Sequence, residues 1–286
     1  PAIMEELYTL PQYREHLARR NNRQTIMLGF SDGTKDGGYL MANWSIYKAK
    51  DELTRLSREH GIEVIFFDGR GGPPARGGGK THRFYSSMGK NIAGDALELT
   101  IQGQTVSSNF GTVAAARYNI EQLLHAGIYT ELFAPRQITF TTDEEALMQQ
   151  LAESSFTAYD ELKTHPDFLD YLSAVSPLRF YAETNIGSRP AKRGVGKLTL
   201  KGLRAIPFVG AWSQIKQNVP GFYGVGSALE QMDGKIDQIA AMYHTNGFFK
   251  ALIDNCEMAM QKSYFPLTAF LADDPNYGEI WRKIRD

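Results

Sequence analysis

The sequence contains a single cysteine, Cys256, and this scarcity excludes two kinds of structure. One cysteine cannot form an internal disulfide, and a chain without a cysteine pair lacks the usual ligands of a structural zinc site. Such a composition is typical of proteins that work in a reducing interior, so we expect a cytoplasmic location. The thiol itself is expected to be a small buried apolar group.

Neither an excess of one charge nor a long apolar run is present. The 31 basic and 32 acidic residues give a formal net charge of −1, which argues against nucleic acid as a partner because nonspecific binding uses a broad positive field. No run of about 18 apolar residues could cross a bilayer, so we expect no membrane association. With 42% hydrophobic residues, the 286-residue chain can build a substantial core, as one large domain or two small ones.

Helix-like and strand-like segments alternate in the first half of the chain. Apolar residues recur at helical spacing in residues 2–20, 40–60 and 112–125. Short apolar runs predict buried strands at residues 25–30, 63–67 and 97–101. Further along, the pattern favours helix at 143–172 and 228–261, with strand-like runs at 180–182 and 206–208.

These elements favour an α/β fold that is predominantly helical and forms part of a TIM-like (β/α) barrel with additional helices. In such a barrel the strands are parallel, and functional groups lie on the loops that follow their carboxyl ends. Asp32, Asp68 and Gln102 follow the three predicted strands, so we expect them to emerge at one face. An incomplete barrel would also leave some apolar surface exposed.

Three segments combine glycine with charged residues far more densely than the rest of the chain: residues 31–38, 68–82 and 185–193. Glycine lets a backbone approach an anion closely, and arginine supplies a fork of donors that fits phosphate or carboxylate. A single segment of this kind could be an ordinary surface turn with solvated charges. Three of them in one chain indicate a site for a polyanion.

Two more specific functions can be considered for these segments, a metal site and a nucleotide-binding P-loop. Asp32, at the end of a predicted strand, could ligate Mg²⁺ or Mn²⁺, although such ions need further oxygen ligands and a lone aspartate is often a helix cap. Gly79-Lys80-Thr81 imitates the end of a phosphate-binding P-loop. That motif requires a glycine where this chain has Pro74, so we reject a P-loop nucleotidase.

The amino-acid sequences of these segments, and their order along the chain, are similar to those of a known family. Five stretches carry the likeness: Gly29 to Gly38, Phe67-Asp68-Gly69-Arg70-Gly71-Gly72 followed by Arg76-Gly77-Gly78-Gly79, Ile101-Gln102-Gly103, Asn185 to Arg193, and Leu203-Arg204-Ala205-Ile206-Pro207. On these motifs the chain resembles the phosphoenolpyruvate carboxylases through nearly its whole length.

The resemblance implies a reaction and its participants. Bicarbonate would attack the phosphate of phosphoenolpyruvate, and the resulting enolate would be carboxylated to oxaloacetate, with Mg²⁺ or Mn²⁺ and without biotin. Asp32 would be a metal ligand. Residues that would hold phosphate, carboxylate or bicarbonate, or act in catalysis, are Lys35, Asp68, Arg70, Arg76, Gln102, Arg189 and Arg204.

The resemblance also implies regulation and assembly. Arg76 lies in a glycine-rich loop that moves in the family and is captured by an acidic inhibitor such as aspartate or malate, and Lys262 matches the inhibitor-binding lysine. The parent enzyme would be a homo-oligomer, a tetramer by family likeness. Family members are much longer, so residues 1–286 are interpreted as a carboxy-terminal fragment truncated at both ends and inactive alone.

One departure from the family pattern bears on activity. Asp68 stands where the pattern has a histidine that assists the enolate and carboxylation steps. An aspartate cannot donate as an imidazolium does, and its negative charge should oppose an anionic substrate. A noncatalytic anion-binding module, regulatory or scaffolding, is therefore the alternative to an enzyme fragment.

Overall fold

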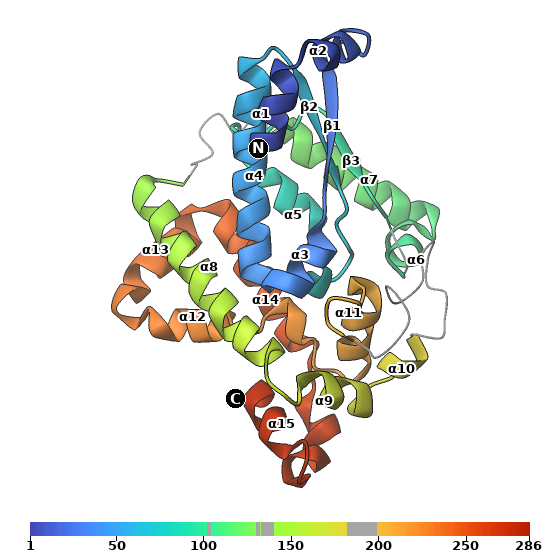
Figure 1. The fold of residues 1–286 in the computed structure, drawn as a ribbon, viewed down its shortest axis with the longest axis vertical. Coiled ribbons are helices and arrows are strands. Elements are labelled where there is room, and N and C mark those ends of the chain that lie inside the picture. Colours follow the sequence, from blue (N-terminus) through green and yellow to red (C-terminus); the bar gives the residue numbers. More distant parts are fainter. Residues whose placement is uncertain (102–103, 130–131, 133–139, 182–198) are drawn as a thin grey trace.

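The computed structural model describes residues 1–101, 104–129, 132, 140–181 and 199–286. Within them the chain is mostly helical, with one small sheet in the upper part of the molecule and a group of helices beyond the strands' carboxyl ends (Figure 1). This confirms a helix-rich α/β fold. A closed TIM barrel is not shown, because the described residues contain one three-stranded sheet.

The sheet consists of β1 (Arg23–Leu28), β2 (Glu63–Asp68) and β3 (Leu97–Leu99), in that order. Both pairs of strands are parallel, as predicted. Leu28 is paired with Asp68, and Asp68 with Leu99, so all three strands end at one level. The segments that follow the strands consequently begin at a common edge of the sheet.

The helices near the sheet agree largely with the sequence pattern. They are α1 (Ala2–Thr9), α2 (Pro11–Ala18), α3 (Phe30–Gly37), α4 (Tyr39–Glu59), η1 (Pro74–Arg76), α5 (Thr81–Ser86), α6 (Gln104–Phe110) and α7 (Val113–Ile128). The helices predicted at residues 2–20, 40–60 and 112–125 are therefore confirmed. Thr112 begins α7 as its cap, because its side chain accepts from the Ala115 amide.

The remaining elements are helical. They are α8 (Thr142–Lys163), α9 (Phe168–Val175), α10 (Leu178–Tyr181), α11 (Ala205–Gln214), η3 (Val219–Gly221), α12 (Val225–Gln231), η4 (Asp233–Lys235), α13 (Ile236–Thr245), α14 (Gly247–Gln261), η5 (Phe265–Asp273) and α15 (Gly278–Arg285). The long helical stretches predicted at 143–172 and 228–261 are thus each divided into shorter helices.

Three local predictions were wrong. The segment after β1 was predicted to be a loop carrying Asp32, but it forms α3. Phe180 and Tyr181 belong to α10, and the apolar run at 206–208 lies in α11. Pro207 is compatible with α11 because it occupies the first turn, where a backbone N–H has no partner within the helix.

Two large clusters of buried side chains stabilise the fold. One includes Phe66 of β2, Trp44 of α4 and Phe248 of α14, and it joins the sheet to its covering helices. The other surrounds Trp212 of α11 with side chains of α9 and α15. Apolar side chains on α7 remain exposed, for example Val113 at 86% and Leu124 at 59%.

Cys256 is buried in the first cluster, as predicted, and burial raises the pKa of its thiol. Every helix of the described ranges is too short or too polar to traverse a bilayer.

Candidate functional site

The carboxyl end of β2 places Asp68 in the interior of the protein. Its side chain is fully buried, and Oδ2 accepts two hydrogen bonds. The Lys50 ammonium of α4 donates from 2.6 Å, and the Tyr85 hydroxyl of α5 donates from 2.7 Å. Oδ1 is buried and has no hydrogen-bond partner among the described residues. A strand and two helices thus converge on one carboxylate.

Burial governs the electrostatics of this cluster. It lowers the pKa of Lys50, and the Asp68 carboxylate acts in the opposite direction. It raises the pKa of Tyr85 well above the ordinary value, with Asp68 adding to the effect, so the phenol stays protonated and donates. Lys50 and Asp68 therefore form a buried pair, with their side chains 2% and 0% exposed.

Arg70 follows Asp68 by two residues and has a fixed guanidinium. It stacks on the Phe84 ring, 4.2 Å from the ring centre, and its Nη1 donates to the Thr81 hydroxyl at 3.1 Å. Burial lowers its pKa, whereas Tyr85, Tyr39 and Asp68 act against that shift. Its Nε and Nη2 are buried without a hydrogen-bond partner in the described part of the chain. Within the described ranges, the two donors thus have no acceptor.

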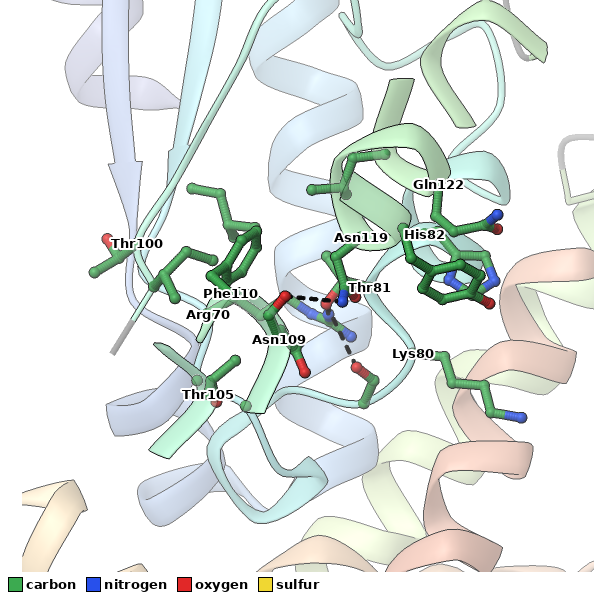
Figure 2. A pocket seen from close by; sticks show the side chains of 17 residues that line it. Arg70, Lys80, Thr81, His82, Thr100, Thr105, Asn109, Phe110, Asn119 and Gln122 are labelled. Carbon is green, nitrogen blue, oxygen red and sulfur yellow. Dashed lines mark hydrogen bonds between the residues drawn. The ribbon is translucent and has the colours of Figure 1, made fainter. Parts of the chain in front are cut away.

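A cavity of about 290 Å³ adjoins Arg70. Figure 2 shows the hydrogen bond from Arg70 to Thr81, with Asn109 of α6 and Asn119 of α7 nearby. Other polar side chains in the lining are Lys80, His82, Thr100, Thr105, Tyr118 and Gln122. The cavity is rich in donors, and none of the described residues that line it is acidic, a composition that suits a small anion.

The glycine-rich loop between β2 and α5 folds back on itself. The amides of Gly78 and Gly79 donate to the carbonyls of Pro73 and Gly72, each at 2.9 Å. Gly77 and Gly79 have φ values of +71° and +120°, which side-chain-bearing residues rarely adopt. The loop is compact as a result, and its movement stays a prediction.

Two neighbours outside the loop hold it in place. The Asn255 side chain of α14 accepts from the Lys80 amide at 3.2 Å, and a Cβ on Gly79 would lie 2.2 Å from Asn255 Oδ1. At the other end, the Ser31 hydroxyl donates to the Arg76 carbonyl at 3.3 Å. The loop is therefore anchored to α14 and to α3.

Replacing Asn255 by alanine should loosen this loop without unfolding the protein. Losing one hydrogen bond of about 1 kcal/mol raises the open fraction about fivefold. Limited digestion with trypsin measures the opening, because Arg76 and Lys80 are cleavage points within the loop. Gln261→Ala, an exposed change on the same helix, is the matched control. Equal cleavage of the two variants would mean that Asn255 does not hold the loop.

Helix α3 carries Asp32 and Lys35 in contrasting environments. Asp32 is exposed in the first turn, and it acts against the burial that lowers the pKa of Arg76. Lys35 is buried, and its ammonium donates to the Asp36 carboxylate and, at 3.4 Å, to the Leu200 carbonyl. The structure thus brings Asp32 toward Arg76, while Lys35 already has acceptors.

The other predicted site residues are more dispersed. Arg204 begins α11, which contacts α3 and η1, and its buried Nε has no hydrogen-bond partner among the described residues. Lys262 is exposed at the end of α14. Gln102 and Arg189 lie outside the described residues.

Sequence reasoning did not identify Lys50, Tyr85 or Asn255. A signal existed for Lys50, which follows buried Tyr47 by three residues and precedes buried Thr54 by four, and so shares their face of α4. Tyr85 and Asn255 carried no such signal, because their roles depend on contacts between distant segments.

The chain is similar in sequence to known proteins over almost its full length. A family model described as phosphoenolpyruvate carboxylase matches residues 1–284. Among curated proteins, a phosphoenolpyruvate carboxylase from Corynebacterium diphtheriae is 37% identical over 290 residues, which cover 97% of this chain and 32% of the relative. The chain therefore spans about a third of the length of this curated relative.

Proposed function

Because the chain belongs to the phosphoenolpyruvate carboxylase family, we propose that it forms the anion-binding part of a site that joins bicarbonate to phosphoenolpyruvate. The products are oxaloacetate and phosphate. In this proposal the residues described here bind and orient the anions, and the whole enzyme carries out the reaction.

The observation that supports the proposal most directly is the state of Arg70. Its guanidinium is fixed by Phe84 and Thr81, yet Nε and Nη2 are buried without partners among the described residues. Leaving buried donors unsatisfied is costly, so such groups are expected to meet a ligand. A prepositioned cation also stabilises the charge that builds up on phosphoryl and enolate oxygens during the reaction.

Other cations are assigned by family likeness and by their placement. Arg76 lies in the compact loop next to Arg70, and Arg204 begins a helix that contacts η1 of that loop. We propose that both approach the substrate anions. By family likeness, Lys35 is also proposed to help hold phosphate, carboxylate or bicarbonate. Arg189 and Gln102 keep their proposed roles as substrate ligands from outside the described residues.

The family also uses a divalent metal, Mg²⁺ or Mn²⁺, which acts as a Lewis acid on substrate oxygens when bound. Asp32 is exposed and can offer one carboxylate ligand. The described ranges hold no group of three His, Cys, Asp or Glu side chains placed to bind a metal ion. Their residues therefore do not form a metal site on their own, and no catalytic step is assigned to the metal.

Regulation and assembly follow from the same family likeness. Arg76 and Lys262 are proposed to contact an acidic effector, aspartate or malate, and the full-length protein is proposed to be a homotetramer. Lys262 is exposed and thus accessible to such an effector.

The proposal is tested with the full-length protein that contains this chain. We expect bicarbonate-dependent formation of oxaloacetate, followed through its reduction by malate dehydrogenase. The isolated 286 residues should give no measurable turnover, but a nonreactive phosphonate analogue of phosphoenolpyruvate should raise their melting temperature, because a ligand that binds only the folded state stabilises it. A full-length protein that binds the analogue but forms no oxaloacetate would favour the noncatalytic anion-binding module. No response to millimolar analogue would contradict the anion site itself.

A further inference from the structure

The strongest unexplained feature of the site is the buried pair of Lys50 and Asp68, whose carboxylate interacts with Arg70. Asp68 stands at the end of β2, Lys50 reaches it from α4, and Tyr85 reaches it from α5. These side chains come from three separate elements and meet at one oxygen atom. An arrangement of this kind places a carboxylate in a defined position rather than leaving it to solvent.

Asp68 alone would weaken an anion site, because its negative charge interacts with Arg70. Lys50 removes this difficulty. Whether the proton resides on the ammonium or passes to the carboxylate, the two groups together carry no net charge. Arg70 therefore retains its full positive charge for a ligand.

Lys50 is also enclosed in a way that favours this single role. Its side chain is 2% exposed, and its ammonium lies 4.9 Å from the centre of the Phe66 ring and 5.6 Å from that of Tyr85. Aromatic faces attract the cation but accept no strong hydrogen bond, so they direct the ammonium toward the carboxylate. Tyr85 is both a ring neighbour of Lys50 and a donor to Asp68.

We propose that Lys50 is a positioning residue for the anion site, which holds and neutralises Asp68 so that an aspartate can occupy this position without opposing substrate at Arg70. Tyr85 completes the arrangement by fixing the same carboxylate oxygen. The inference rests on the proposed function, since it concerns how that anion site keeps its charge.

The test compares the affinity of the chain for the phosphonate analogue in Lys50→Met, Asp68→Asn and the double variant. We expect Lys50→Met to bind about tenfold more weakly, equivalent to about 1.4 kcal/mol, because Asp68 is left unpaired. Asp68→Asn should bind at least as tightly as the unchanged chain. The affinity of the double variant should return to within about threefold of that of the unchanged chain, since neither charge remains. Lys48→Met is the matched control, because it removes an exposed charge from the same helix.

Rescue by the double variant separates this role from simple packing, since removing the Asp68 charge cannot restore a lost methylene contact. Circular dichroism checks the fold of each variant. If Lys50→Met alone fails to fold, the affinities of Asp68→Asn and of the double variant still test the inference. A loss of about tenfold in the affinity of either variant for the analogue overturns it. Lys50→Met binding as tightly as Lys48→Met also overturns it. If the unchanged chain does not bind the analogue, the proposed function fails together with the inference. If the unchanged chain binds but the variants give either of the contrary results above, only the inference fails and the proposed function stands.

Discussion

We expect the replacement of Arg70 by methionine to lower kcat/KM of the full-length protein by about a hundred- to a thousandfold, the usual effect of removing one preorganised group with the proposed role of stabilising transition-state charge. The reason lies in its geometry. The guanidinium is already stacked on Phe84 and bonded to Thr81, so it does not have to reorganise when charge develops on the substrate. Methionine fills a similar volume but offers neither Nε nor Nη2.

Two further variants test whether the expected loss of kcat/KM comes from the geometry of the guanidinium or from its charge alone. Arg70→Lys keeps a positive charge but loses the planar fork and its stacking, so we expect a substantial loss here too. Arg83→Met removes an exposed arginine from the neighbouring helix α5 and should leave kcat/KM nearly unchanged. Turnover of Arg70→Met within about threefold of the unchanged enzyme would contradict the role assigned to Arg70.

Replacing Gly78 by alanine should prevent the glycine-rich loop from closing. An added Cβ would lie 2.2 Å from the carbonyl oxygens of both Gly71 and Gly72. These are backbone atoms that cannot turn aside like the end of a side chain, so the loop itself must shift. Overpacking commonly costs about 1–3 kcal/mol, and in this case the cost falls on the segment that carries Arg76.

We therefore expect weaker binding of the phosphonate analogue to Gly78→Ala, by about tenfold or more, together with faster tryptic cleavage in the loop. Gly94→Ala is the control, because its nearest neighbour would be 3.9 Å from the new Cβ. An unchanged affinity in Gly78→Ala would show that anion binding does not depend on the compact conformation of the loop described above.

The first two strands could be predicted from sequence because each contains a short apolar run, which is followed by Gly29 in β1 and by Asp68 in β2. Val64 and Phe66, for example, are both buried on one face of β2. Helix α3 could not be predicted, since glycines at positions 33, 37 and 38 disfavour helix in isolation. Tertiary contacts override that preference: the Tyr159 hydroxyl donates to the Lys35 carbonyl at 3.0 Å.

The helical conformation of the run at 206–208 shows a different limit. Ile206, Pro207 and Phe208 form a short apolar run of the kind that suggests a buried strand, and nothing local to them specifies α11. Phe208 and Trp212, one turn apart, are both fully buried in the second cluster. The four-residue spacing of these two side chains is typical of a helix. It could not be detected from residues 206–208 alone, on which the strand prediction depended.

For the site, the sequence indicated which loops are candidates for anion binding but not how their charges are balanced. Arg70 and Arg76 stood out because their glycine neighbours are unusual. The expected repulsion by Asp68 was derived without knowing that Lys50, 18 residues earlier, lies against it. A charged residue within a helix is normally solvated, so only the packed structure could reveal a lysine as the counterion.

The buried pair of Lys50 and Asp68 also constrains which substitutions this sequence can accept during evolution. A buried charge stripped of its counterpart costs about 3–5 kcal/mol, a large part of the margin by which most proteins stay folded. Either substitution by itself would thus be disfavoured, whereas an exchange of both residues, or one preceded by a stabilising change elsewhere, would be tolerated. Aspartate at the end of β2 and lysine in α4 should accordingly be inherited as a unit, and lineages that carry one without the other should be rare.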